Sequence, residues 1–252
     1  MRRNVAEKRA KIKVENLTKS FGDLLVLKDL NFDIYDGEFL CVVGPTGCGK
    51  TTFCNVVSRL LPATQGSIRM DGEEIDPSRH NVSFVFQEPS CIPWRTVWQD
   101  IGIGLEIKKV NSEETRRRLE DIIQLVGLKG FEGFYPHQIS AGMKQRVAIA
   151  RAFVTEPDLL LMDEPFGQLD TNTRFQIETR LIDVWEKTRR TVIFVTHNLE
   201  EAVYLAERIL VLTNKPTTIK EVLNVDLPRP RNFADLHFVS IRRRVTELVK
   251  WW

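Results

Sequence analysis

The sequence lacks the features that mark several large classes of protein. It has only four cysteines in 252 residues, with no CxxC pair, and so lacks the density of a disulfide scaffold. No run of about 18 apolar residues occurs, and no membrane-spanning helix is expected. The N-terminal charges precede no apolar stretch, so we expect no secretory signal. We therefore expect a globular protein of a reducing, cytosolic compartment.

Net charge is also nearly absent, but the charges are unevenly distributed. Lys and Arg number 36 against 34 Asp and Glu, a balance of +2. Residues 1–13 carry +5 and residues 228–252 carry +4, which leaves the stretch 14–227 at −7. We interpret the N-terminal run as a solvated tail, with contact to anionic lipid headgroups as the alternative.

The basic C-terminal stretch predicts an amphipathic helix. Its apolar side chains fall on one helical face, and its basic side chains lie mostly away from that face. Such a helix either lies on a membrane or docks on the rest of the protein, and we expect docking. The apolar set is Phe238, Ile241, Val245, Leu248, Val249 and Trp252, and the basic set is Arg242, Arg243, Arg244 and Lys250.

Short β-like segments alternate with amphipathic helices, which predicts an α/β fold. The expected strands are 12–17, 24–35, 39–43, 82–86, 159–162, 191–196 and 209–212, with a hairpin at 68–73 around Asp71-Gly72. Helices are expected from Lys50 to Leu61, near 119–126, near 177–185 and near 199–206. A mainly helical insertion at 88–150 interrupts the α/β pattern. We predict one domain whose core is 1–87 and 151–220, followed by an extension at 221–252.

A glycine-rich loop predicts a phosphate-binding site. Gly44-Pro45-Thr46-Gly47-Cys48-Gly49-Lys50-Thr51 fits G-x-x-x-x-G-K-[ST] between a predicted buried strand and a predicted helix. Glycines let the backbone N–H groups approach phosphate oxygens, and the helix N-terminus adds a positive potential. Lys50 is suited to the β- and γ-phosphates, and the Thr51 hydroxyl to one Mg²⁺ position.

Two acidic residues follow a second buried strand. Leu159 to Met162 is an apolar run that leads directly into Asp163 and Glu164. In open α/β folds, ligands bind at the carboxyl ends of such strands. We expect Asp163 to hold Mg²⁺ through water and Glu164 to orient or deprotonate the attacking water.

Further motifs resemble those of the ATP-binding cassette (ABC) family. Ile139-Ser140-Ala141-Gly142-Met143-Lys144-Gln145-Arg146 is similar to the LSGGQ signature, with Ser140 as N-cap. Gln87 stands where the family has its Q-loop, 166–170 resembles its D-loop, and His197 resembles its switch histidine. The motifs occur in family order, and the similarity covers most of the chain. The resemblance implies a P-loop NTPase (RecA-like) core, a small antiparallel β subdomain and a helical signature subdomain.

The resemblance also implies that ATP and Mg²⁺ bind between two cassettes, which are identical or different. Implied nucleotide contacts are Phe21 on adenine, the loop Gly44, Pro45, Thr46, Gly47, Cys48, Gly49, Lys50, Thr51 and Thr52, and the second cassette's Ser140, Ala141, Gly142 and Met143. Implied catalytic residues are Glu164, His197, Lys50 and Gln87, and implied Mg²⁺ ligands are Thr51, Gln87 and Asp163. His197 is expected to contact the γ-phosphate and to sense its loss.

Three positions depart from the family pattern. Ala141 replaces the first glycine of the signature, Met143 replaces its glutamine, and Gln168 stands where the D-loop has alanine. Gly142 is retained, and a methyl group at position 141 removes no N–H donor. We expect active but slower hydrolysis.

Within the family, the sequence is similar to the ATPase subunits of nitrate, sulfonate, taurine and bicarbonate importers. The segments that carry this similarity are 87–97, 143–152, 162–167 and 227–231, in a chain with one cassette. The resemblance implies a separate membrane permease, docked at 87–94 with Ile92 and Trp94 as apolar anchors, and a periplasmic or lipid-anchored solute-binding protein. It implies a peripheral location at the cytoplasmic membrane face and a small anionic solute.

Three alternatives remain open at the level of sequence: another kind of transporter, a non-transport ABC ATPase and a nucleotide-binding scaffold. The segment from Lys50 to Ser140 is too short for the coiled coil of DNA-repair ABC ATPases. The acidic body disfavours a nucleic-acid partner, and we expect none. Because the acidic, lysine and histidine motif residues are all present, an inactive cassette is disfavoured as well.

Overall fold

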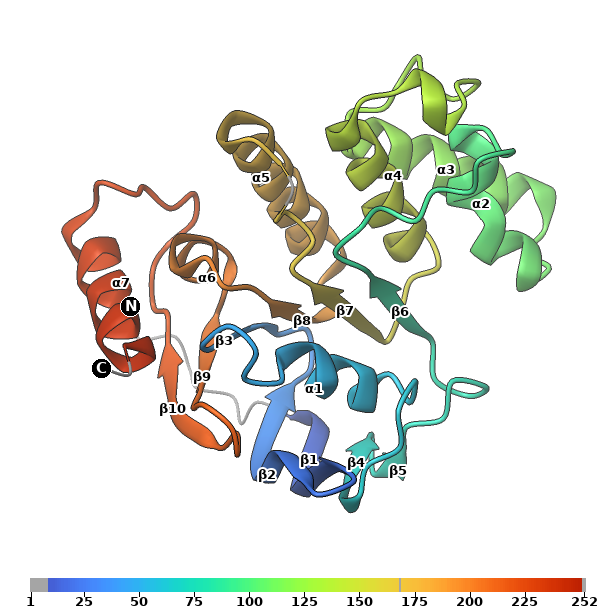
Figure 1. Cartoon of the computed structure of the whole chain (residues 1–252). Coiled ribbons are helices and arrows are strands. Elements are labelled where there is room, and N and C mark those ends of the chain that lie inside the picture. The colour runs from blue at the N-terminus through green and yellow to red at the C-terminus, as the bar shows by residue number, and fades with distance from the viewer. Residues whose placement is uncertain (1–8, 168, 251–252) are drawn as a thin grey trace. The chain divides into compact units, whose positions relative to one another are not determined.

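The computed structural model describes residues 9–167 and 169–250, and the chain divides into two compact units (Figure 1). Unit 1 comprises Met1–His80 and Thr191–Trp252, and unit 2 comprises Asn81–Arg190. The predicted division at 87, 150 and 220 concerns subdomains and stays a prediction. No helix in the described part of the chain is long and apolar enough to cross a membrane.

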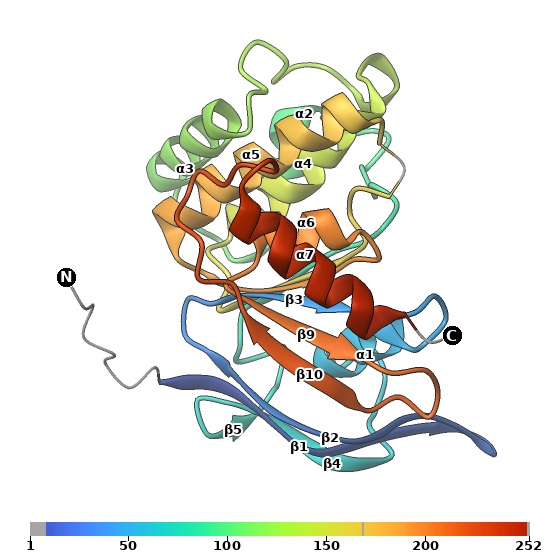
Figure 2. The same cartoon turned by 90° about the vertical axis from the view of Figure 1, so that its left-hand side faces the viewer.

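Unit 1 contains a four-stranded antiparallel sheet in the order β2-β1-β4-β5 (Figure 2). Its strands are β1 (Ala10–Phe21), β2 (Leu24–Tyr35), β4 (Gln65–Met70) and β5 (Glu73–Glu74). The predicted hairpin turn at Asp71-Gly72 is confirmed, because both residues have positive φ, of 51° and 88°.

Unit 1 also contains the strand order β10-β9-β3-β8. Strand β3 (Phe39–Val43) is parallel to both β8 (Thr191–Val195) and β9 (Arg208–Leu212), while β10 (Ile219–Asn224) is antiparallel to β9. Every residue of β3 and β8 is buried, as their continuous apolar runs predict. The helices of this unit are α1 (Lys50–Val57), α6 (Leu199–Leu205) and α7 (Leu236–Val249).

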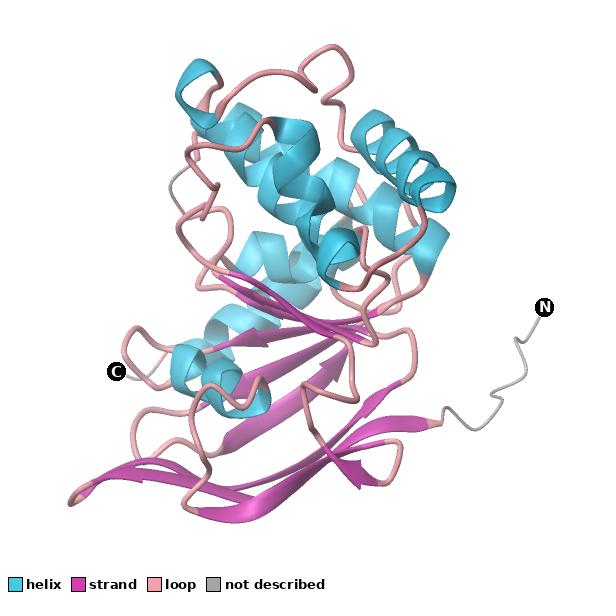
Figure 3. Ribbon diagram, turned by 90° about the vertical axis from the view of Figure 1, so that its right-hand side faces the viewer, coloured by secondary structure: helices cyan, strands magenta, loops and turns pink. Residues whose placement is uncertain are grey.

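Unit 2 is mainly helical, as Figure 3 shows. Two parallel strands, β6 (Val82–Val85) and β7 (Leu159–Asp163), accompany α2 (Val97–Ile107), α3 (Ser112–Leu125), α4 (Ala141–Phe153) and α5 (Thr171–Thr188). A short 3₁₀ turn, η1 (Pro136–Gln138), precedes α4. The predicted insertion is thus helical, and the α/β fold class is confirmed.

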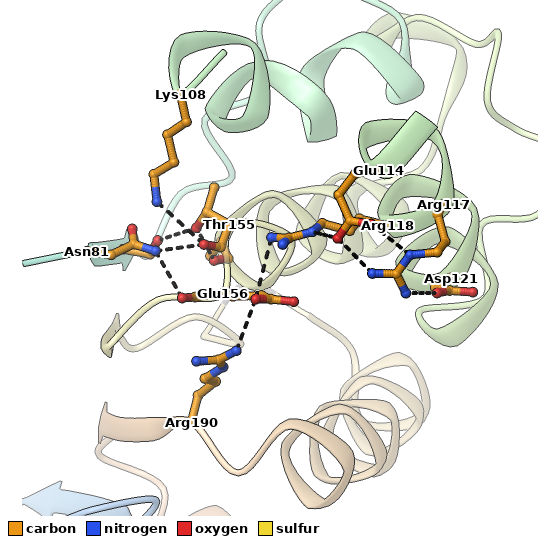
Figure 4. Close-up of polar contacts among 11 residues, drawn as sticks. Asn81, Lys108, Glu114, Arg117, Arg118, Asp121, Thr155, Glu156 and Arg190 are labelled. Atoms are coloured by element: carbon orange, nitrogen blue, oxygen red, sulfur yellow. Dashed lines mark hydrogen bonds and ion pairs between the residues drawn. The ribbon is translucent and has the colours of Figure 1, made fainter. Parts of the chain in front are cut away.

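A polar network joins the ends of several elements of unit 2 (Figure 4). The Asn81 amide donates to the carbonyl oxygens of Thr155 and Glu156 at 2.6 and 3.0 Å. The Glu156 carboxylate accepts ion pairs from Arg118 at 3.5 Å and Arg190 at 3.3 Å. These contacts hold the turn between α4 and β7, the strand whose far end carries the acidic pair.

Docking of the C-terminal helix is confirmed. Helix α7 packs on α6 and β9 and buries Phe238, Val245 and Leu248 (Figure 2). Its basic residues pair within unit 1, since Arg242 pairs with Glu200 and Arg244 with Glu221. Trp252 of the predicted apolar face lies outside the described residues.

Two further arginines of the basic C-terminal stretch hold the end of α6. Arg229 donates to the carbonyl oxygens of Tyr204 and Leu205, and the buried Arg231 donates to those of Val203, Tyr204 and Ala206 at 2.6 to 3.0 Å. The last carbonyls of a helix have no partner inside the helix, and guanidinium groups satisfy them here. Burial lowers the pKa of the Arg231 guanidinium.

Replacing Arg231 with Met is expected to lower the free energy of unfolding by about 2–3 kcal/mol, because it leaves buried carbonyls without their charged donor. The measurement is urea unfolding followed by circular dichroism. Arg244→Met is the matched control, and loss of its exposed ion pair is expected to cost less than about 1 kcal/mol. Equal losses in the two variants would contradict the capping role.

At the other end of the chain, most of the predicted N-terminal tail, residues 1–8, lies outside the described residues. Arg9 and Lys11 are described, and both pair with Asp71 at 2.6 and 2.7 Å. Lys11 thus lies in β1, Arg9 immediately precedes that strand, and both are held in unit 1 through Asp71.

Candidate functional site

The predicted phosphate loop of unit 1 connects β3 to α1 and depends on its glycines. Gly47 and Gly49 have φ of 75° and 115°, which side chains disfavour, and Gly49 is the N-cap of α1. A Cβ on Gly44 would lie 3.0 Å from the Cys48 Sγ and 3.1 Å from the Leu212 Cβ. Glycine at 44 therefore lets the loop pack on β9, and glycines at 47 and 49 allow it to curl.

The Lys50 ammonium lies across this loop. Its Nζ donates to the carbonyl oxygens of Gly44 at 3.1 Å and Pro45 at 3.2 Å, and the side chain is buried. Thr46, Gly47 and Thr51 are exposed beside it, while Thr52 is half-buried. A buried ammonium, glycine N–H groups and the N-terminus of α1 together favour an anion. Burial raises the pKa of the neighbouring Cys48 thiol, which disfavours a competing thiolate there.

His197 lies at the same strand edge as the phosphate loop. Val42 of β3 pairs in parallel with Val195 of β8. Gly44 comes two residues after Val42 and His197 two residues after Val195, so both lie at the same edge of the sheet. The Thr196 N–H donates to the Val42 carbonyl oxygen at 3.2 Å, which extends the pairing to the residue before His197. Unit 1 thus brings the predicted histidine and the predicted loop to one edge.

The loop around His197 is fixed from α6. The buried Glu201 accepts a hydrogen bond from the Thr196 hydroxyl at 2.5 Å, and that hydroxyl accepts from the Asn198 N–H at 2.9 Å. Asn198 also caps α6. His197 itself is exposed, as a residue that contacts a ligand has to be.

Phe21 lies at the end of β1, where it pairs with Leu24 across the turn to β2, and is 46% exposed. The Lys19 ammonium lies 4.8 Å from the ring centroid and donates to the Pro62 carbonyl oxygen at 2.7 Å. An exposed ring held by a cation fits a stacking surface, but its contact with adenine stays a prediction.

In unit 2, the predicted acidic pair ends β7. Asp163 is the last residue of the strand and is buried, while Glu164 is half-buried with φ of 46°. A left-handed backbone at a non-glycine residue is strained, and such strain concentrates at functional sites. Other described non-glycine residues, among them Lys109 and Glu156, also have positive φ, so the backbone by itself does not mark Glu164 as functional.

Gln87 lies close to the turn that follows these acids. Its Nε2 is 3.6 Å from the position that a Cβ on Gly167 would take, and the Gly167 N–H donates to the Glu164 carbonyl oxygen at 3.2 Å. Unit 2 therefore brings two predicted site residues, Gln87 and Glu164, to one turn. Gln168 in the same turn lies outside the described residues.

The predicted signature forms the N-terminus of α4. The Ser140 hydroxyl accepts from the Met143 N–H at 3.3 Å, which confirms Ser140 as N-cap. A Cβ on Gly142 would lie 2.5 Å from the Thr173 Cγ2, so this glycine lets α4 approach α5. Ala141 is exposed and Met143 is half-buried. The exposure of Ala141 indicates that packing does not require its methyl group.

One structural pair near the site escaped sequence reasoning. The buried Asp100 forms a 2.7 Å ion pair with Arg151 of α4 and accepts from the Ile92 N–H at 2.9 Å. Arg151 also donates to the Ser90 carbonyl oxygen at 2.7 Å. The pair thus holds the segment after Gln87 on α4. Its only sequence signal is that Asp100 falls on the apolar face of α2, beside Val97 and Ile101.

The predicted metal ligands fit Mg²⁺ by their chemistry. Thr51, Gln87 and Asp163 offer a hydroxyl, an amide and a carboxylate oxygen, and Mg²⁺ takes oxygen ligands with one or two carboxylates plus phosphates and waters. Over residues 9–167 and 169–250, the structure holds no cluster of three or more His, Cys, Asp or Glu suited to a metal. The described residues therefore form no metal site built from such protein ligands alone.

Comparisons of sequence agree with this assembly of motifs. The profile of the family described as ABC transporter matches residues 27–167. An uncharacterized ABC transporter ATP-binding protein of Methanocaldococcus jannaschii is 42% identical over 246 residues, 96% of this chain and 92% of that protein. The aliphatic sulfonates import ATP-binding protein SsuB of Bacillus licheniformis is 44% identical over 220 residues, 87% of this chain and 85% of that protein.

Solved structures show the same similarity. CbiO1 of Clostridium perfringens, described as part of the ABC transporter complex cbiONQ, matches with a TM-score of 0.77 and 28% identity, over 87% of this chain and 90% of that one. The ATP-binding cassette MJ0796, in a dimeric post-hydrolysis state bound to ADP and Pi, matches with a TM-score of 0.74 and 31% identity, over 86% of this chain and all of that one.

Proposed function

The chain belongs to the ABC transporter family, and from this premise we propose that it is the ATP-hydrolysing subunit of an importer for a small anionic solute. As a member of this family, the chain is an ATPase that binds ATP. The observation that carries the proposal is the phosphate loop with His197 at the end of the neighbouring parallel strand. Similarity to sulfonate import ATP-binding proteins supports the importer and the class of solute.

The predicted residues take several proposed roles in hydrolysis. Lys50 and the loop N–H groups bind the phosphates, and His197 contacts the γ-phosphate. Glu164 orients the attacking water and accepts its proton. Thr51, Gln87 and Asp163 would hold Mg²⁺ as oxygen ligands, and the ion would supply positive charge to the phosphate oxygens. The geometry that supports these roles is the curled loop in unit 1 and the position of Asp163 and Glu164 at the carboxyl end of β7 in unit 2.

A second cassette, identical or different, is the proposed partner at the nucleotide. Ser140 and Gly142 of one cassette would cap the γ-phosphate bound by the other, since the N-terminus of α4 favours an anion. The solved dimers of MJ0796 support this arrangement, and one of them is described with bound ADP and Pi.

A membrane permease is the proposed second partner. Trp94 is 77% exposed on the segment that Asp100 and Arg151 hold against α4, and a large apolar side chain on a supported loop fits a protein contact. Through the permease the subunit would be held at the cytoplasmic face of the membrane, with a solute-binding protein as an indirect partner. ATP-driven closure and reopening of the cassettes would drive the transport cycle.

The experiment is reconstitution of the chain with its permease and solute-binding protein in vesicles, followed by uptake of a labelled alkanesulfonate, taurine or nitrate. We expect uptake that requires ATP and is lost in the Glu164→Gln variant. ATP hydrolysis without binding to any permease would instead support the alternative, a non-transport ABC ATPase or nucleotide-binding scaffold.

A further inference from the structure

Thr217 lies behind the phosphate loop in unit 1. It belongs to the connection between β9 and β10, and its side chain is fully buried. Sequence motifs gave no reason to select it, because the connection matches no nucleotide-binding pattern. Its contacts nevertheless join three parts of unit 1: this connection, strand β2 and the loop itself.

The backbone of Thr217 is fixed on both sides to β2. Its N–H donates to the Val26 carbonyl oxygen at 2.8 Å, and its carbonyl oxygen accepts from the Lys28 N–H at 2.9 Å. These two bonds form a parallel bridge opposite Leu27. Strand β2 pairs with β1 along most of its length, so Thr217 is anchored to a continuous sheet.

From this position the Thr217 side chain reaches the loop. The Thr217 hydroxyl donates to the Cys48 carbonyl oxygen, across 169 residues of sequence. The next residue is also close to this segment, because a Cβ on Gly49 would lie 2.8 Å from the Val26 Cγ1 and 3.7 Å from the Thr217 Oγ1. The Cys48–Gly49 peptide is thus packed directly against the anchored segment.

A hydrogen bond to this carbonyl sets the direction of the next N–H group. The peptide unit is planar and trans, so its C=O and N–H groups point in opposite directions. Because the Cys48 carbonyl points to Thr217, the Gly49 N–H points away from Thr217. Gly49 holds φ of 115° at the N-cap of α1, a conformation that the carbonyl contact supports.

We propose that Thr217 is a positioning residue of the phosphate loop, which orients the Cys48–Gly49 peptide so that the Gly49 N–H faces a bound phosphate. The proposal rests on the proposed function, since it requires a nucleotide in the loop. In this role Thr217 acts through the Cys48–Gly49 peptide and not by its own contact with the phosphate. Its hydroxyl is the required group, and its methyl group is not.

The test compares Thr217→Val, which keeps the shape and removes the donor, with Thr217→Ser, which keeps the donor. MgATP and inorganic tripolyphosphate are titrated separately into the purified full chain by calorimetry. Thr217→Val is expected to raise both dissociation constants about tenfold, the ratio for one buried acceptor left without its donor. Thr217→Ser keeps the hydroxyl and is expected to bind both ligands with wild-type affinity.

Thr218→Val is the matched control, because its hydroxyl contacts Thr213 in the same connection and not the loop. A structural role without positioning predicts that Thr217→Val lowers the unfolding temperature while the folded protein binds MgATP unchanged, and this result overturns the proposal. If Thr217→Val does not fold, Thr217→Ala removes the same donor, and its affinity for MgATP is compared with that of Thr217→Ser in the same way. Failure of the wild-type chain to bind MgATP would instead refute the proposed function.

Discussion

Replacing Glu164 with Gln is expected to lower the steady-state rate of ATP hydrolysis about 10³-fold and to leave ATP binding almost unchanged. The carboxylate is proposed to accept the proton of the attacking water, and loss of a general base costs on the order of 10²- to 10⁴-fold. The amide keeps the shape of the side chain, and Glu164 makes no proposed contact to the phosphates. Phosphate release and MgATP titration measure the two effects.

The matched control is Glu120→Gln, which removes an exposed carboxylate paired with Arg116 on α3. It is expected to hydrolyse ATP at the wild-type rate. The Glu164→Gln variant is also expected to accumulate as an ATP-bound dimer, because the closed dimer reopens only after ATP is hydrolysed. Rapid phosphate release by this variant would refute the assignment of Glu164.

The second large effect is expected at Lys50. Lys50→Ala removes the buried ammonium that lies across the phosphate loop. With it goes the proposed charge-assisted contact to the β- and γ-phosphates. Charged hydrogen bonds contribute about 1.5–3 kcal/mol, so the dissociation constant for MgATP is expected to rise roughly 10- to 150-fold. Hydrolysis at a fixed, subsaturating ATP concentration falls by at least the same factor.

Calorimetric titration of MgATP measures this loss, with Lys129→Ala as control. Lys129 is an exposed lysine between α3 and η1 and belongs to none of the predicted motifs. Thermal unfolding without nucleotide shows whether Lys50→Ala keeps the fold, since Lys50 also bonds the Gly44 and Pro45 carbonyls. Unchanged affinity in a folded Lys50→Ala protein would contradict the phosphate-loop assignment.

Most elements were predictable because their signals are local. The continuous apolar runs of β3 and β8 predict strands buried on both faces, and both strands are completely buried. Helix α1 ends at Val57, four residues before the predicted end at Leu61. The prediction missed β10, an edge strand of alternating half-buried and exposed residues that is defined by its pairing with β9.

The motifs of the site were also local, and the contacts that support them were not. A sequence pattern finds the phosphate loop because glycine and lysine have fixed spacing. It does not find Thr217, whose partner Cys48 is 169 residues away, or the pairing of Asp100 with Arg151 across 51 residues. For Gly142, the structure adds a packing reason, the close approach of Thr173 on α5.

The charge asymmetry of the sequence has a structural explanation at the C-terminal end. Arg229 and Arg231 bond the end of α6, and Arg242 and Arg244 pair with Glu200 and Glu221. These charges serve folding within unit 1. The basic C-terminal stretch therefore gives no separate support for binding to a membrane surface.

In the proposed mechanism, ATP is hydrolysed at a site that a second cassette completes. Its most direct test is the rate of phosphate release by the purified wild-type chain at saturating MgATP, measured over a wide range of protein concentrations. We predict that activity per molecule rises in proportion to concentration when the protein is dilute and reaches a plateau when dimers saturate. Activity per molecule that stays constant at every concentration, or no phosphate release at all, would contradict the account.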